Sequence, residues 1–201
     1  MKFFTPDLYA KTNSTEYGVV ERAMKEWDIA NTAYGEELQK LLPRVDPSVK
    51  DFIISARFHD AEVLAAQDKV ADRTSWTLPD DHQRDRRIRF FMLSLRTDDS
   101  IVCVNYVLRR PFAFATNTEL GVFATKRRVW LYDELLIDPN WYETRRGVAV
   151  MPEEFVPRPD LVHSILFSDG LELALPFSDV LVTTVPLAKI CADFTQPTEI
   201  R

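Results

Sequence analysis

The sequence predicts an α+β protein in which an N-terminal long amphipathic helix and a short helix pack on an antiparallel sheet of about six or seven strands. Two patterns support this prediction. Between about residues 14 and 42, apolar residues recur every three or four positions, as they do on one face of a helix. Beyond residue 60, apolar and polar residues alternate in short runs that are separated by turns, as in the strands of an antiparallel sheet.

The two helices are predicted by their ends as well as by their periodicity. Asn13 followed by Glu16 has the form of a capping box at the start of the long helix, and Pro43 ends it. Asp46-Pro47 offers a cap with proline at the first helical position, which predicts a short helix over 47–55. The apolar stripe of the long helix should cover the sheet, with Met24, Trp27, Tyr34 and Leu38 buried against Phe91, Leu93 and Val104.

The strands are predicted by alternation and by the turns between them. Residues 61–66 form a first strand, and the polar stretch 68–86 is expected to be a long loop. The segments 87–96 and 100–109 are two strands joined by a tight turn. The runs LVHSILF and LELALPF flank Ser168-Asp169-Gly170, and an Asp-Gly between two such runs is a strong hairpin signal. The other predicted strands are 120–125, 128–136, 147–151 and 179–186.

Length, composition and charge favour a single domain over residues 1–201, with a helical part (1–55), a sheet part (56–190) and a tail (191–201). The net charge is −6, and nucleic-acid-binding domains are usually basic, so no nucleic-acid partner is expected. No apolar run approaches the roughly 20 residues of a membrane span, and Pro6 and Asp7 interrupt any signal peptide. We therefore expect a cytoplasmic protein with no membrane partner and no cofactor. Its oligomeric state stays open.

His59-Asp60 is the pair of residues closest to a catalytic motif. Metal-dependent phosphohydrolases use a His-Asp pair together with further His and Asp ligands, and here only His82 and His163 remain, so no metal site is predicted. The structural alternative is a turn in which the Asp60 carboxylate accepts hydrogen bonds from backbone amides. Cys103 and Cys191 lie in separate apolar runs, which predicts two buried, reduced thiols.

Basic residues are the other candidate binding feature. Arg109, Arg110, Arg127 and Arg128 fall at predicted strand ends, where they would bind an anion or an acidic protein if they converged on one edge of the sheet. They are also expected to pair with nearby acids and to protect exposed edges. Trp76, within the long loop, is the tryptophan least needed for folding, so it joins them as a candidate binding residue. The acids expected to pair with these arginines are Asp80, Asp81, Asp85, Asp98, Asp99, Asp133 and Glu134.

Three segments resemble landmarks of a known family. They are MKFFTPDLY at the start, FHDAEV at 58–63 and SILFSDGLELALPFSDV at 164–180. This combination looks like an uncharacterised bacterial family, a domain of unknown function, and the resemblance touches both ends and the middle of the chain. It implies a bacterial cytosolic origin and brings no activity and no site residues with it.

Two functions of different classes follow from these patterns. The first is a non-enzymatic cytosolic interaction module, a class that includes immunity-type proteins that bind a toxin. The second is a small-molecule hydrolase that uses His59 and Asp60 with a third group from the sheet. The chain has no glycine-rich phosphate loop and no Gly-x-Ser-x-Gly motif, which favours the first. Whether the protein is an enzyme stays open, with the weight on a non-enzymatic role.

Overall fold

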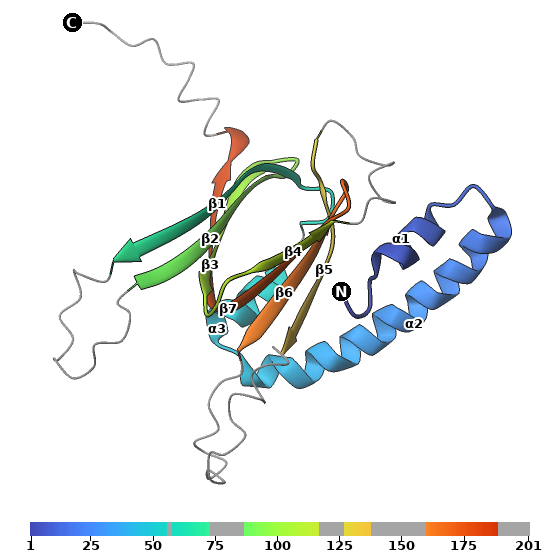
Figure 1. Cartoon of the computed structure of the whole chain (residues 1–201), viewed down its shortest axis with the longest axis horizontal. Coiled ribbons are helices and arrows are strands. Elements are labelled where there is room, and N and C mark those ends of the chain that lie inside the picture. The colour runs from blue at the N-terminus through green and yellow to red at the C-terminus, as the bar shows by residue number, and fades with distance from the viewer. Residues whose placement is uncertain (56–57, 73–86, 117–126, 138–159, 189–201) are drawn as a thin grey trace, which may run out of the picture.

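The computed structural model describes residues 1–55, 58–72, 87–116, 127–137 and 160–188. The helices occupy the N-terminal part and the strands follow, as Figure 1 shows, so the predicted α+β class is confirmed. The helices are α1 (Pro6–Thr12), α2 (Tyr17–Leu41) and α3 (Pro47–Ser55), with a 3₁₀ turn, η1 (Leu42–Arg44), after α2. The strands are β1 (Glu62–Asp72), β2 (Arg87–Arg96), β3 (Ser100–Leu108), β4 (Ala113–Thr116), β5 (Trp130–Ile137), β6 (Leu161–Phe167) and β7 (Leu171–Pro186).

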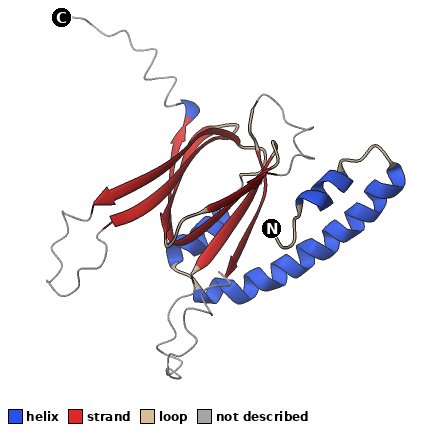
Figure 2. Ribbon diagram, viewed as in Figure 1, coloured by secondary structure: helices blue, strands red, loops and turns tan. Residues whose placement is uncertain are grey.

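The described strands form one antiparallel sheet in the order β1-β2-β3-β7-β6-β5, with β4 paired to β7. The 16-residue β7 joins the two halves of the sheet, because its first part pairs with β6 and β4 and its second part pairs with β3. The start of β1 also bonds to the start of β5, where the Val63 amide donates to the Arg128 carbonyl at 2.8 Å. The sheet therefore curls back on itself into a partly closed barrel (Figure 2).

The core lies inside this curled sheet. In β3 the residues alternate between buried and half-buried along the whole strand, which identifies one face as internal and the other as external. Helix α3 adds Val49 and Phe52 to the same core, and the Phe52 ring packs edge-on against Tyr106. Each such side chain contributes about 1.5–3 kcal/mol when it is fully buried. The inward residues of the two halves include Phe91, Leu93, Val104, Tyr106, Ile165, Phe167, Leu173 and Phe177.

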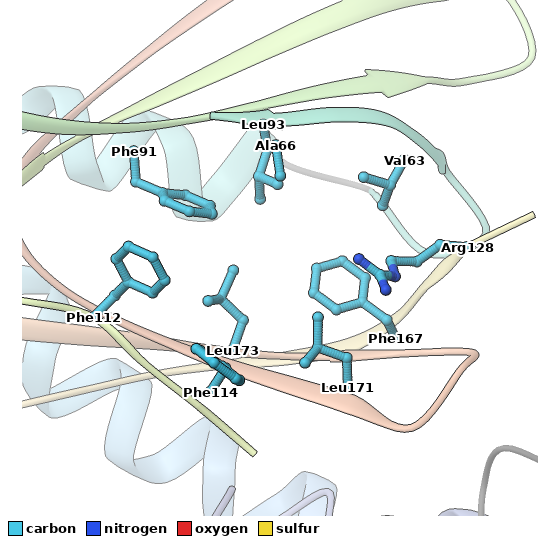
Figure 3. A pocket seen from close by; sticks show the side chains of 10 residues that line it. All are labelled: Val63, Ala66, Phe91, Leu93, Phe112, Phe114, Arg128, Phe167, Leu171 and Leu173. Carbon is cyan, nitrogen blue, oxygen red and sulfur yellow. The ribbon is translucent and has the colours of Figure 1, made fainter. Parts of the chain in front are cut away.

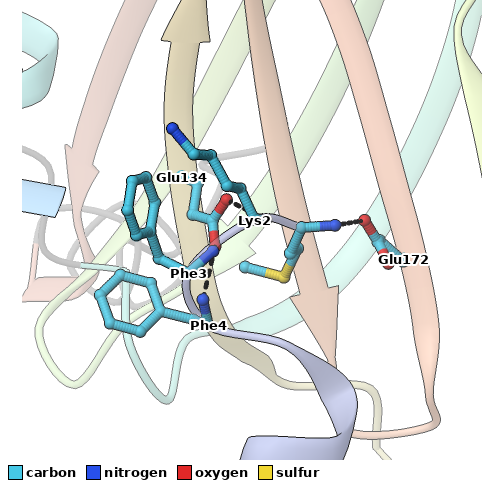
Figure 4. A network of polar contacts seen from close by, with 6 residues as sticks. Lys2, Phe3, Phe4, Glu134 and Glu172 are labelled. Carbon is cyan, nitrogen blue, oxygen red and sulfur yellow. Dashed lines mark hydrogen bonds and ion pairs between the residues drawn. The ribbon is translucent and has the colours of Figure 1, made fainter. Parts of the chain in front are cut away.

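A buried carboxylate attaches the N-terminal segment to the sheet. Glu134 of β5 is 0% exposed, and its two oxygens accept the backbone N–H groups of Lys2, Phe3 and Phe4 at 2.6, 2.6 and 2.5 Å (Figure 4). The N-terminal ammonium of Met1 pairs with Glu172 on β7. A buried charge is tolerated where several hydrogen bonds satisfy it, so this network fixes where α1 begins.

The long helix predicted over about 14–42 is confirmed as α2, but the structure predicted for its N-terminal end is wrong. A separate helix, α1, precedes it, and the Thr5 hydroxyl caps α1 by accepting the Leu8 amide at 3.2 Å, with Pro6 in the first turn. Asn13 terminates α1, and the Glu16 side chain makes no capping bond, so these two residues form no capping box. The predicted short helix over 47–55 is confirmed as α3.

The packing predicted for the long helix is also wrong. Helix α2 lies over β5 and against α1 rather than over β2 and β3 (Figure 1). Trp27 stacks on Phe4 and Tyr132, with ring centroids 4.8 and 4.5 Å apart. Met24 is 49% exposed, and Leu38 packs against the main core. The physical reason is that Glu134 draws residues 2–4 onto the sheet, so these residues and α1 take part of the contact expected for α2.

The strand predictions hold where alternation is strong. Segments 87–96 and 100–109 appear as β2 and β3, and the Asp-Gly turn joins β6 to β7 with Gly170 at φ 79°. Strand β1 extends to Asp72, beyond the predicted 61–66. The predicted separate strand 179–186 is instead the second half of β7, and β4 was not predicted. The predicted strands 120–125 and 147–151 lie outside the described residues.

Cys103 differs from its prediction. It lies on the external face of β3 and is half-buried, with its sulfur 3.7 Å from the Ser94 hydroxyl. The alternation of β3 explains this, because Val102 and Val104 on either side of it are the residues that point into the core. Cys191 lies outside the described residues.

Candidate functional site

The main candidate site is an apolar cavity of about 240 Å³ between the two halves of the curled sheet. Its walls come from strands that are far apart in the sequence (Figure 3). An apolar cavity of about 150 Å³ is enough to bind benzene, so this one has room for a small organic molecule. The described lining residues are Val63, Ala66, Phe91, Leu93, Phe112, Phe114, Arg128, Phe167, Leu171 and Leu173.

The bend between β3 and β4 creates one wall of this cavity. Both strands pair with β7, and residues 109–112 between them form a short connection in which Pro111 provides no N–H for the ladder. Phe112 then packs against Phe91 of the opposite half, with ring centroids 4.7 Å apart. Phe114, two positions further, lines the cavity while remaining 70% exposed, which places it at the mouth. The sequence Pro-Phe-Ala-Phe therefore sends two aromatic rings toward the same space.

Arg128 is the one described lining residue that carries a charge, and it lies at one end of the cavity (Figure 3). Its guanidinium stands over the Phe167 ring, 5.9 Å from the centroid. Its Nε donates to Oδ2 of Asp169 at 2.6 Å, and its Nη2 lies 2.5 Å from the same oxygen. The other oxygen of Asp169 accepts the Leu171 amide at 3.2 Å, so the β6–β7 turn holds this carboxylate in place.

A second ion pair lies beside the same cavity. Arg89 of β2 stands over the Phe112 ring, 5.4 Å from its centroid, and its Nε donates to Asp68 of β1 at 2.8 Å. The hydrogen bond from Arg89 holds the pKa of the Asp68 carboxyl below its ordinary value. Both arginines next to the cavity therefore carry a carboxylate partner.

His59 and Asp60 lie in the turn between α3 and β1, and both side chains are exposed. His59 Nδ1 is 2.9 Å from Asp60 Oδ2, and the His59 ring lies 5.2 Å from that of Tyr132. The Asp60 backbone has a φ of 68°, in the left-handed region, and its amide donates to the Trp130 carbonyl at 2.9 Å. Among the described residues, the Asp60 carboxylate therefore contacts the neighbouring imidazole ring, and no backbone amide donates to it as the predicted turn required.

His163 is in the core and not beside His59. Its Nε2 lies 2.9 Å from Asp133 and its Nδ1 lies 2.8 Å from the Tyr106 hydroxyl. Because a carboxylate only accepts, Nε2 carries a proton and donates it to Asp133, and the Tyr106 hydroxyl is the partner of Nδ1. Burial raises the pKa of Tyr106 well above its ordinary value, and the charge of Asp133 adds to this. The network satisfies the buried His163 and Tyr106 side chains from the partly exposed Asp133, which is a structural role.

The remaining predicted site residues do not converge on one surface. Arg109 lies 3.4 Å from Asp160 near the end of β3, and Arg127 lies 3.4 Å from Glu62 near the start of β5. Arg110 is exposed beside Arg109. Arg109, Arg127 and Arg128 pair with acids, as one of the two predictions had it, but their described partners, Asp160, Glu62 and Asp169, are not among the acids that were predicted. Trp76 and His82 lie outside the described residues.

Among the described His, Cys, Asp and Glu side chains, no three come close enough together to hold a metal ion. In the described part of the chain, no helix combines the length and the apolar character needed to cross a membrane.

Sequence reasoning missed the cavity, although it named Arg128. The described lining residues come from β1, β2, β4, β6, β7, the β3–β4 connection and the segment just before β5, and only Phe91 and Leu93 among them were expected as core. The one local signal was Phe112 and Phe114, which alternate directly after Pro111 and lie outside every predicted strand.

Fold and site together define an α+β protein with a curled antiparallel sheet around an apolar cavity. Comparison of the chain with models of protein families, with curated proteins and with solved structures finds no match. The resemblance to an uncharacterised bacterial family therefore stays a prediction.

Proposed function

We propose that the protein is a non-enzymatic binding protein that holds a small apolar molecule between the two halves of its sheet. The observation that carries this proposal is the cavity of about 240 Å³ whose described lining is apolar apart from Arg128. Cores normally pack without voids that exceed a water molecule, and an apolar cavity of this size loses the contacts that a ligand would restore. Mouths of β-barrels are also a common place for small-molecule sites.

The proposal predicts micromolar affinity for a neutral apolar compound. A ligand that buries roughly 300 Å² of apolar surface at about 25 cal/mol per Å² gains about 7 kcal/mol, which corresponds to a dissociation constant on the order of 10 µM. N-phenyl-1-naphthylamine is a suitable probe, because it is uncharged and its fluorescence rises in apolar surroundings. Titration of the protein into the probe measures the constant directly.

A matched pair of variants separates the cavity from the rest of the surface. Ala66 lines the cavity, and Ala65 precedes it on β1 and pairs with Ser94, on the opposite face of the sheet. Ala66→Phe adds a ring about the size of benzene to the cavity and should weaken probe binding at least tenfold. Ala65→Phe makes the same change on the other face and should leave binding unchanged. Equal effects of the two variants, or no saturable binding by the wild type, would refute the proposal.

The wider expectation of a protein-interaction module, including immunity-type binding, is compatible with this proposal and stays a prediction. The hydrolase alternative also stays open, but it has less support. His59 and Asp60 are exposed in one turn, His163 is engaged by Asp133 and Tyr106, and no described cavity brings them together.

A further inference from the structure

The charges beside the cavity indicate what kind of molecule it would take. Arg128 and Arg89 each stand over a phenylalanine ring of the cavity wall, and each is paired with a carboxylate, Asp169 and Asp68. Each pair is neutral as a unit. An anionic ligand would therefore add an uncompensated negative charge to an apolar site, which is costly.

Arg128 nevertheless has donors left for a ligand. A guanidinium carries five N–H groups, and the described contacts with Asp169 are a hydrogen bond from Nε and an ion-pair contact of Nη2. The Nη1 group takes part in none of the hydrogen bonds among the described residues, and the guanidinium lies at the end of the cavity in Figure 3. A hydrogen bond from a charged donor is stronger than one between neutral groups. A carbonyl or ether oxygen at that end would gain such a bond without bringing a charge of its own.

We propose that the ligand of this cavity is an uncharged apolar molecule with one hydrogen-bond acceptor, which Arg128 binds while Asp169 balances its charge and discriminates against carboxylates. This inference rests on the proposed binding function and specifies its ligand class. Asp169 acts here as a specificity residue, because it lies behind Arg128 in the β6–β7 turn and is not among the described lining residues.

Three compounds with the same bicyclic body test this inference on the wild-type protein. They are naphthalene, which has no acceptor, 2-acetylnaphthalene, which has a neutral carbonyl, and 2-naphthoate, which is anionic. Each is titrated against bound N-phenyl-1-naphthylamine at neutral pH. We expect 2-acetylnaphthalene to displace the probe at concentrations at least tenfold lower than either of the other two. Equal or tighter binding of 2-naphthoate would overturn the inference.

Two variants locate the effect. Asp169→Asn removes the charge that balances Arg128, so the affinity for 2-naphthoate should rise at least tenfold and 2-naphthoate should become the compound that binds most tightly. Arg128→Met should abolish the advantage of 2-acetylnaphthalene over naphthalene. An unchanged order of the three compounds in Asp169→Asn contradicts the role of Asp169, whichever way Arg128→Met behaves.

The outcomes separate this inference from the proposed function. If neither the probe nor naphthalene binds the wild type, the cavity is not a binding site and the proposed function fails. If both bind but 2-acetylnaphthalene has no advantage, the binding function stands and only the ligand class is wrong.

Discussion

Replacement of Glu134 should detach the N-terminal segment from the sheet. The side chain is fully buried, and it accepts three backbone N–H groups from Lys2, Phe3 and Phe4. In Glu134→Ala these donors either remain buried without a partner, at about 1–3 kcal/mol each, or leave the sheet. If they leave, Phe4 and Leu8 lose their burial, at about 1.5–3 kcal/mol each. The first route costs about 3–9 kcal/mol and the second about 3–6 kcal/mol, and because the segment takes the less costly route, the expected loss is about 3–6 kcal/mol.

Glu134→Gln should cost less, and the geometry explains how much. Phe3 and Phe4 share one carboxylate oxygen, and Lys2 uses the other. The amide can keep its oxygen toward the first two, but it then presents an N–H₂ group to the Lys2 N–H. One lost bond corresponds to about 1–3 kcal/mol. Glu62→Ala, which removes a carboxylate from a surface pair with Arg127, is the control and should cost less than about 1 kcal/mol.

Urea unfolding and amide hydrogen exchange together measure these effects. The free energy of unfolding gives the size of each loss, and exchange at Lys2, Phe3 and Phe4 shows whether the segment opens locally. The expected order of the losses is Ala, then Gln, then the Glu62 control. A loss below about 1 kcal/mol in Glu134→Ala, with unchanged exchange at these three amides, would refute the argument that this carboxylate positions α1.

Three further predictions concern Asp133 on β5, Asp60 in the turn before β1, and the effect of added metal ions. Burial alone would raise the pKa of Asp133, but the hydrogen bond and charge of His163, with help from the Trp130 indole and the charge of His59, hold it below its ordinary value. The contribution of the Asp133 carboxylate to stability is therefore present above about pH 4 and is lost as the pH falls further. The difference in unfolding free energy between the wild type and Asp133→Asn should shrink between about pH 5 and about pH 2.5. A difference that stays constant over this range would contradict the prediction. At Asp60, where φ is 68°, Asp60→Gly should match or exceed the wild type by up to about 1 kcal/mol, and Asp60→Ala should lose about 1 kcal/mol. Zinc, manganese and magnesium should leave the melting temperature of the wild-type protein unchanged. A metal-dependent rise in that temperature that is absent from both Asp60→Gly and Asp60→Ala would instead support the hydrolase alternative.

Local patterns in the sequence determined most of the secondary structure. Strands β2 and β3 follow from alternation, the β6–β7 hairpin from Asp-Gly, and α3 from Asp46-Pro47. Each of these signals is contained within about ten residues, because the backbone geometry of a strand, a turn or a helix end depends on near neighbours. The error at Asn13 has the same origin, since two residue types that suit a capping box also suit the junction between α1 and α2.

The tertiary structure alone decided how these elements meet. Nothing near Trp27 in the sequence indicates Phe4 and Tyr132 as its neighbours, and that contact depends on a carboxylate at Glu134, more than 100 positions away. The cavity likewise requires β7 to exchange partners along its length and β1 to return to β5. Sheet curvature of this kind results from twist and bulges summed over all strands, so no local pattern in the sequence indicates it. The sequence alone predicted Arg128 as a candidate binding residue. The fold placed Arg128 at the end of an apolar cavity beside Asp169.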